Sequence, residues 1–372
     1  MTNSYKEKLT EATTQYQKLN KQYNQMGLLR LADMLLIIAL GYQVIKAPSI
    51  LMGLFCALAI IVFFLLIVKH KKISARRTIA KTKIRINEQE IAFLEEYIFF
   101  TDNGSVFQQE NHPYAYDLDI LGERSLYHYL NRTHTFLGRK LLAERLLSPT
   151  PERILDTQKQ IQALTPDLTW RQTFTAYAQQ IDDSEEFYTK LSAWAKAPIK
   201  LLSNTMRYTL IALPILLVVC LLIGYGWDNE LLKTIGKLLL TVNLVTFFSF
   251  IGKIAKEKLG FERTYTMLYA FRECIAQVEA RFPERNQQAS TKIAQLSRLL
   301  DDLDSVGNIL VSIPLNAFSF YHIHRYQQLL QWKAHYAAHI EEWLQSVGEI
   351  EVLCSFANFS YNHPNFVYPT LN

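Results

Sequence analysis

Two short motifs in this sequence contain residue types that could support chemistry. His322 and His324 are separated by one residue, and imidazole nitrogens are common zinc ligands. Asp117 and Asp119 form a second pair, and paired carboxylates can act as general acid and general base. Neither pair lies in a cluster of acids, cysteines or histidines that would complete a site. We therefore expect the histidines to have a surface or packing role and the aspartates to form a turn or a cap.

Other familiar catalytic signatures are not found in the sequence. It has no GxxxxGK[ST] loop for nucleotide phosphates, no HExxH zinc motif and no GxSxG nucleophile motif. Its four cysteines, Cys56, Cys220, Cys274 and Cys354, are scattered and form no CxxC pair, which favours reduced thiols over a disulfide framework or a zinc site. The sequence therefore predicts no catalytic residue, no cofactor site and no metal site within this chain.

Four apolar segments dominate the sequence and predict two transmembrane hairpins, at residues 28–68 and 208–252. They are Leu28–Ile45, Leu51–Val68, Tyr208–Trp227 and Leu231–Ile251. Leu51–Val68 and Tyr208–Trp227 carry no charged residue, and each is long enough to cross a hydrocarbon layer of roughly 30 Å. Two alternatives stay open. The segments could be core helices of a soluble bundle, or Leu28–Ile45 and Leu231–Ile251 could lie on the membrane surface.

The charges beside these segments predict their orientation. Basic residues precede and follow both hairpins, whereas the turns hold little besides Lys46, Asp228 and Glu230. Positive charge near span ends stays on the cytoplasmic side. Both hairpins are therefore expected to leave the cytoplasm and return to it, which places the protein in a bacterial-type inner membrane with its soluble parts in the cytoplasm. The lipid bilayer is its first predicted partner.

The remaining segments predict helices. Residues 1–27 form an amphipathic helix, residues 69–110 a basic helix beside the membrane, and residues 111–207 and 253–372 the two parts of a helical domain. The basic helix begins with Lys69, Lys71, Lys72, Arg76 and Arg77. Such a run can face anionic lipid or DNA phosphates, and its position directly after a span favours lipid.

Residues 125–149, SLYHYLNRTHTFLGRKLLAERLLSP, predict a polar joint that opens a short helix. Thr133 or Thr135 can cap that helix through its hydroxyl oxygen. Leucines 137, 141, 142 and 146 are expected to form one buried stripe beyond it. Further apolar seams at residues 287–304 and 321–359 predict long packed helices, with Gly348 as a point that could break or soften the second. The fold class is therefore an all-α helical bundle with two transmembrane hairpins.

Residues 112–149 and 343–369 resemble the two ends of the core, or lever, domain of the MutS-type DNA mismatch repair ATPases. The pattern at residues 112–149 matches at Asp117, Leu118, Gly122, Ser125, Leu126, Leu130, Asn131, Thr133, Thr135, Gly138 and Leu141, with Arg139 and Lys140 at its basic position. Residues 343–369 resemble the end of the same domain. The resemblance implies that residues 131–139 act as a structural pivot, with Asn131, Thr133, Thr135, Gly138 and Arg139 at its centre.

The resemblance also carries expectations about partners and cofactors. In the family this domain leads into an ABC-type ATPase that binds ATP and Mg²⁺ and forms the dimer, and that domain would begin where the chain ends at Asn372. The implied function is to couple the ATPase to DNA binding or to movement connected with mismatch repair, as a homodimer. A different function is a membrane-bound helical scaffold for a protein partner, with no role on nucleic acid. A third is a transporter-like assembly.

Two departures from the family pattern bear on DNA recognition. The family places a DNA clamp within this domain, and here the second hairpin occupies that position. The family reads mismatches with a Phe-x-Glu motif in an N-terminal domain. Phe93-Leu94-Glu95 has that spelling but lies in the helix expected beside the membrane, so we assign it no such role.

Overall fold

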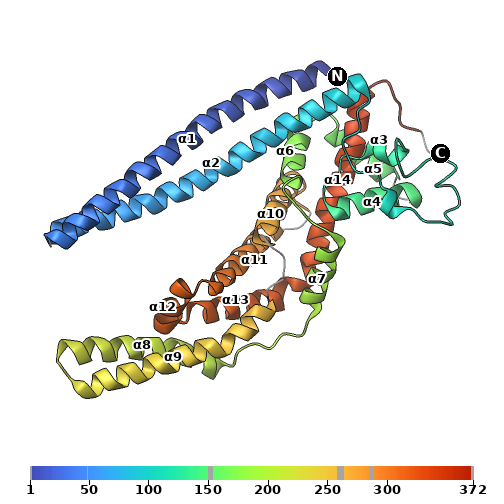
Figure 1. Cartoon of the computed structure of the whole chain (residues 1–372). Coiled ribbons are helices and arrows are strands. Elements are labelled where there is room, and N and C mark those ends of the chain that lie inside the picture. Colours follow the sequence, from blue (N-terminus) through green and yellow to red (C-terminus); the bar gives the residue numbers. More distant parts are fainter. Residues whose placement is uncertain (1, 48, 150–153, 258–263, 285–287, 370–372) are drawn as a thin grey trace.

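The computed structural model describes residues 2–47, 49–149, 154–257, 264–284 and 288–369. Within these ranges the regular elements are helices, with no strand (Figure 1). In chain order the α-helices are α1 (Thr2–Lys46), α2 (Ile50–Glu96), α3 (Leu126–Leu130), α4 (Phe136–Leu147), α5 (Ile154–Leu164), α6 (Leu168–Ala178), α7 (Glu185–Lys196), α8 (Asn204–Gly226), α9 (Glu230–Glu257), α10 (Thr264–Arg281), α11 (Ala289–Asp304), α12 (Ile309–Ser319), α13 (Tyr321–Tyr336) and α14 (Ile340–Asn362). The predicted all-α class is confirmed.

The first hairpin consists of two unusually long helices. The 45 residues of α1 and the 47 of α2 are each continuous, so each helix is roughly 70 Å long at 1.5 Å per residue. One part of each helix is the apolar segment predicted from the sequence, and the rest is the polar helix that was expected next to it. The amphipathic start of α1 and the basic part of α2 are therefore continuous helical extensions of the apolar segments. The basic helix predicted at residues 69–110 is shorter than expected: it ends at Glu96, where Tyr97 adopts the left-handed conformation, and in the rest of that range only Ser105–Phe107 form a 3-10 turn.

The second hairpin, α8 and α9, projects from the helical core in the same direction as the first. Figure 1 shows the turns of both hairpins at the same side of the molecule, away from α14 and the N-terminus. All four hairpin helices are long and apolar enough to cross a membrane. The apolar side chains of the first hairpin are mostly exposed, as Leu35 and Leu65 illustrate. Two parallel, solvent-facing apolar hairpins are a surface that suits a bilayer.

The core of the molecule is built around α14. This helix packs against α4, α5 and α10, and α11 packs against α10 and α13. The predicted seam of α11 is confirmed, because Ile293, Leu296, Leu300 and Leu303 are all buried. The core extends to the base of the second hairpin, where Leu210, Phe250 and Ile254 join the same cluster. The second hairpin is thus continuous with the core.

Two further details differ from the sequence-based expectations, and the alternative left open at Gly348 is resolved. The apolar repeat at residues 321–359 forms two helices, α13 and α14, because the chain tightens into a 3-10 turn at Ala337–His339. Gly348 lies within α14 and does not break it. The leucine stripe of α4 is also less regular than predicted: Leu142 is fully buried with Ala143 and Leu147, while Leu137 packs partly on one cluster and Leu141 and Leu146 on another. A helix placed between two clusters is covered on more than one face.

Glycines allow α8 and α9 to approach closely. A Cβ atom on Gly224 would lie 2.9 Å from the backbone nitrogen of Lys233, and one on Gly236 would lie 2.7 Å from a methyl carbon of Leu221. Small residues at helix contacts are the usual means of packing helices within a membrane. Near the turn, Lys233 pairs with Asp228 and Glu230, so its charge is held at the tip of the hairpin.

We expect Gly224→Ala to destabilise the second hairpin by about 1–3 kcal/mol, because the added methyl group meets backbone that cannot move away cheaply. Gly226→Ala is the matched control, because a Cβ there meets nothing within 4 Å. Thermal unfolding of the detergent-solubilised variants measures the difference. Equal melting temperatures for the two variants would show that the close approach of α8 and α9 contributes no stability.

Candidate functional site

The predicted joint at residues 131–139 is a buried network of hydrogen bonds. Asn131, Thr133 and Thr135 are all nearly inaccessible to solvent. The Asn131 side chain donates to the carbonyl of Asp102 at 2.9 Å, and its Oδ1 accepts from the backbone and hydroxyl of Thr133 at 2.9 and 2.7 Å. The Thr135 hydroxyl accepts from the amide of Gly138 at 3.0 Å. Thr135 is therefore the cap of α4, and Thr133 instead fixes the turn before it.

Two acidic side chains complete this helix start, Glu351 from α14 and Asp183 from the segment between α6 and α7. Glu351 of α14 accepts from the amide of His134 at 2.7 Å, from the amide of Thr135 at 3.3 Å and from the Thr135 hydroxyl. Asp183 accepts from the amide of Phe136 at 2.9 Å. Carboxylates at a helix N-terminus satisfy free amides and interact favourably with the helix dipole. The joint is thus attached to α14 by hydrogen bonds as well as by apolar packing.

Gly138 has a packing role in the same place. A Cβ on Gly138 would lie 2.3 Å from a carboxylate oxygen of Glu351, and one on Gly348 would lie 3.0 Å from the Gly138 backbone nitrogen. The two glycines therefore face each other where α4 crosses α14. Arg139 lies at the edge of this crossing, where its guanidinium donates to the carbonyl of His134 at 3.1 Å.

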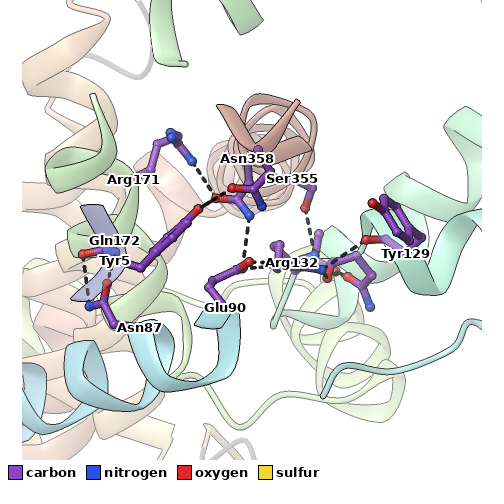
Figure 2. A network of polar contacts seen from close by, with 12 residues as sticks. Tyr5, Asn87, Glu90, Tyr129, Arg132, Arg171, Gln172, Ser355 and Asn358 are labelled. Carbon is purple, nitrogen blue, oxygen red and sulfur yellow. Dashed lines mark hydrogen bonds and ion pairs between the residues drawn. The ribbon is translucent and has the colours of Figure 1, made fainter. Parts of the chain in front are cut away.

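A buried ion pair joins the first hairpin to this joint (Figure 2). The Arg132 guanidinium contacts both carboxylate oxygens of Glu90 in α2, and it also donates to the carbonyl of Asn131 at 2.7 Å. Only 4% of the Glu90 side chain and 10% of the Arg132 side chain are exposed. The Arg132 guanidinium also lies over the rings of Phe93 and Phe100, 4.5 and 4.8 Å from their centroids. We refer to this ion pair and the contacts around it as the junction.

Asn358 of α14 connects the other helices to the junction. Its amide nitrogen donates to Glu90 at 3.1 Å, and its oxygen accepts from the Tyr5 hydroxyl at 3.0 Å and from Arg171 at 2.9 Å. Figure 2 shows these side chains converging from α1, α2, α6 and α14. Asn87 and Gln172 add a second bond between α2 and α6, at 2.7 Å. Both helices of the hairpin are therefore bonded to the core.

The basic residues predicted to meet lipid or DNA fall into two groups. Lys69, Lys71, Lys72 and Arg76 are exposed on α2. Arg77 instead lies over the rings of Tyr16 and Tyr23, 5.8 and 4.5 Å from their centroids, so it helps to hold α1 against α2. Lys72 and Arg76 line a groove of about 680 Å³ between the hairpin and the core, together with Lys18 and Lys83.

The other candidate residues are either buried in the packed core or exposed in a turn. His322 is fully buried, and its ring bonds to Asn316 at 2.6 Å and to Ser305 at 2.9 Å. Asp117 and Asp119 lie exposed in a turn. Phe93 is 3% exposed, so its ring is not accessible for stacking on a base. Among the described residues no group of three or more His, Cys, Asp or Glu side chains could hold a metal ion.

Comparison with protein families identifies the core. The model of MutS domain III matches residues 107–357, a range that runs from the end of the 3-10 turn at Ser105–Phe107 into the last turns of α14 and contains the joint. The chain belongs to the MutS domain III family. The match spans more than half of the chain and includes the second hairpin. Neither curated proteins nor solved structures give a significant match.

Sequence reasoning missed Glu90 and Asn358, which bond the first hairpin to the core, and Glu351, which bonds α14 to the joint. Glu90 lies among other polar residues of α2, so its type alone does not distinguish it from an exposed acid. A signal was present at Glu351, since this acid stands between Ile350 and the apolar residues Val352-Leu353-Cys354, and a charge on a buried face requires a partner. Its partners, over two hundred residues earlier in the chain, could not be read from the sequence.

The cap of α4 gives the first prediction for this site. Thr135→Val keeps the shape of the side chain but removes the hydroxyl, which leaves the Gly138 amide and an oxygen of Glu351 without that partner. We expect a loss of about 1–3 kcal/mol in the free energy of unfolding, measured by chemical denaturation in detergent. Thr135→Ser retains the hydroxyl and should recover most of the stability. Equal losses in both variants would contradict the capping role.

The ion pair gives the second prediction. Glu90→Gln leaves the Arg132 guanidinium buried without a carboxylate. We expect the free energy of unfolding to fall by about 3–5 kcal/mol, the usual cost of breaking a buried ion pair. Glu88→Gln removes an exposed acid from the same helix and serves as the control. Thermal unfolding of both variants in detergent measures the effect. A Glu90→Gln protein as stable as the control would show that the junction does not hold the hairpin to the core.

The pH dependence of Glu351 gives the third prediction. Burial, opposed by its hydrogen bonds to Thr135 and His134, raises the pKa of Glu351 to about 7. The folded state therefore keeps a proton that the unfolded state releases near its ordinary pKa of 4.5. Proton binding at Glu351 therefore adds to the free energy of unfolding. This contribution is complete below about pH 4.5 and is lost as the pH rises through about 7.

Glu351→Gln removes this titration. We expect the stability of the wild-type protein relative to Glu351→Gln to fall as the pH rises across that window, and to change little above it. Denaturant midpoints of the two proteins, measured at a series of pH values, test this expectation. A difference that is constant with pH, or that grows as the pH rises, would contradict it.

Proposed function

We propose that this chain is the core region of a membrane-anchored MutS-like protein, in which the two hairpins hold the core at the bilayer. In this proposal the core couples a C-terminal ABC-type ATPase, with its ATP and Mg²⁺, to DNA binding or to movement connected with mismatch repair. The proposal combines the MutS domain III match with the four apolar helices. The single observation that carries it is the junction, which bonds the first hairpin to the joint of that domain.

The arrangement of the hairpins supports membrane anchoring. Both turns lie on one side of the molecule (Figure 1), so one flat bilayer can receive both hairpins while the core stays outside it. The exposed residues Lys69, Lys71 and Lys72 directly follow the apolar segment of α2, at the height of the lipid headgroups. Cytoplasmic lysines at that position attract anionic lipid.

The junction supports mechanical coupling. A buried ion pair that also bonds to backbone carbonyls resists rotation, because any displacement separates desolvated charges. Glu90 lies in the same continuous helix as the apolar segment 51–68. Movement of the joint relative to α14 would therefore reach the bilayer through α2 without a flexible linker between them.

Extraction and reconstitution test the anchoring. The protein should remain in the membrane pellet after alkaline carbonate treatment and require detergent for release. A variant with residues 28–68 replaced by a short polar turn should still be retained through the second hairpin, and removal of both hairpins should release the core. Release of the intact protein by carbonate would overturn the anchoring.

Binding to plain, mismatched and branched DNA duplexes at two salt concentrations tests the nucleic-acid part. We expect binding at low salt that weakens steeply as salt rises, and that is reduced by the pair Lys72→Glu and Arg76→Glu. Lys159→Glu, at an exposed position on α5, is the control. No binding to any duplex at low salt would instead support a scaffold that holds a protein partner at the membrane.

A further inference from the structure

The helix α12 (Ile309–Ser319) was not expected from the sequence, and no part of the chain that the structure describes covers its outer face. Leu310 is 89% exposed and Ile309 is 66% exposed, and the remaining exposed apolar side chains of the helix are Val311, Leu315 and Phe318. Contiguous apolar surface of this kind marks a contact with another molecule or with lipid. The opposite face packs against α8 and α9.

A hydrogen bond fixes the depth of α12 relative to the second hairpin. The side chain of Asn243 in α9 donates to the carbonyl of Ala317 at 2.8 Å, and both residues are buried. Asn243 lies near the centre of the apolar segment Leu231–Ile251. A residue bonded to the centre of a membrane-spanning segment lies at the depth of the hydrocarbon layer. Figure 1 shows α12 beside α8 and α9, on the side of the molecule toward which both hairpins project.

The segment enters and leaves this layer from the same side. Before α12 the chain comes from α11, and after it α13 returns along the base of α9, where the ring of Tyr326 lies 6.2 Å from that of Phe250. With 11 residues, α12 is about 16 Å long, which is too short to cross a bilayer of roughly 30 Å. Its geometry is that of a re-entrant helix.

At the C-terminal end of α12, polar groups of the backbone form hydrogen bonds within the protein. The amide of His322 donates to the side chain of Asn316 at 3.0 Å, and the amide of Phe320 donates to the carbonyl of Asn316 at 3.1 Å. The Asn316 side chain bonds in turn to the carbonyl of Ser312 at 2.6 Å. Non-helical backbone is tolerated at membrane depth only where protein groups satisfy it, and this turn meets that requirement.

We propose that α12 is a re-entrant helix whose outer face, Ile309, Leu310, Val311, Leu315 and Phe318, inserts into the hydrocarbon of the bilayer beside α8 and α9. The proposal rests on the membrane anchoring above and adds a third membrane contact, which comes from the MutS domain III core itself. Because α12 is linked directly to α11 and α13, the core would contact lipid between its own helices, in addition to being tethered through the hairpins.

Fluorophore labelling at single cysteines tests this. Cys56 and Cys220 are replaced by alanine, and the fully buried Cys274 and the buried Cys354 are retained. An environment-sensitive dye is attached at Leu310→Cys in α12, at Leu238→Cys in the middle of α9, or at Arg298→Cys on the exposed side of α11. Each protein is reconstituted in vesicles, and quenching by nitroxide-labelled acyl chains is compared with quenching by aqueous iodide.

We expect the dye at positions 310 and 238 to lose most of its emission to the acyl-chain nitroxide and to be protected from iodide. The dye at position 298 should show the opposite pattern. Quenching of position 310 by iodide, with position 238 still quenched from the lipid, would overturn the re-entrant helix and leave the anchoring intact. Protection of position 310 from both quenchers would also overturn it, since a protein would then cover α12. Iodide quenching at position 238 would refute the anchoring itself.

Discussion

The arrangement of this protein depends on the burial of one carboxylate, that of Glu90. A carboxylate removed from water is costly unless charge and hydrogen bonds replace its hydration. Here the Arg132 guanidinium supplies the charge, and Asn358 supplies a further hydrogen bond. Glu90 belongs to α2, Arg132 to the joint and Asn358 to α14. All three segments must therefore be in place at once. The direction of the first hairpin is thereby fixed relative to the MutS domain III core.

The same requirement explains why the joint is polar although it is buried. Its backbone amides belong to a helix start and have no partners within α4. Thr135, Glu351 and Asp183 satisfy them from three parts of the chain. The crossing of Gly138 and Gly348 brings α4 and α14 close enough for the Glu351 carboxylate to reach. A larger residue at either glycine would separate the carboxylate from its donors, so packing and hydrogen bonding at this site depend on each other.

The sequence predicted the features that local composition determines. Uncharged runs such as Leu51–Val68 identified the hairpins, and the spacing of Ile293, Leu296, Leu300 and Leu303 identified a buried seam. The pairing of Glu90 with Arg132 was not predictable, because helical periodicity shows which face is buried but not what it meets. The helix α12 was missed for a different reason: it is shorter than a span, and Pro314 within it resembles a break. The turn between α13 and α14 contains Ala337 and Ala338, which carry no signal for ending a helix.

The junction can transmit displacement along the first hairpin because the helices of that hairpin are continuous. The helix α2 runs without interruption from its apolar end to Glu90, and α1 is bonded through Tyr5 to both Asn358 and Asn362 in the last turns of α14. A rotation of the end of α14 would therefore act on both helices of the first hairpin at the end opposite their apolar turn. The second hairpin meets α10 and α13 through apolar packing, and two polar contacts join α9 to the core, Asn243 to Ala317 and Glu257 to Lys333. The two hairpins are thus connected to different helices of the core, the first to the end of α14 and the second to α12 and α13, so a rotation of α14 would act on the first hairpin directly and on the second only through the helices between them.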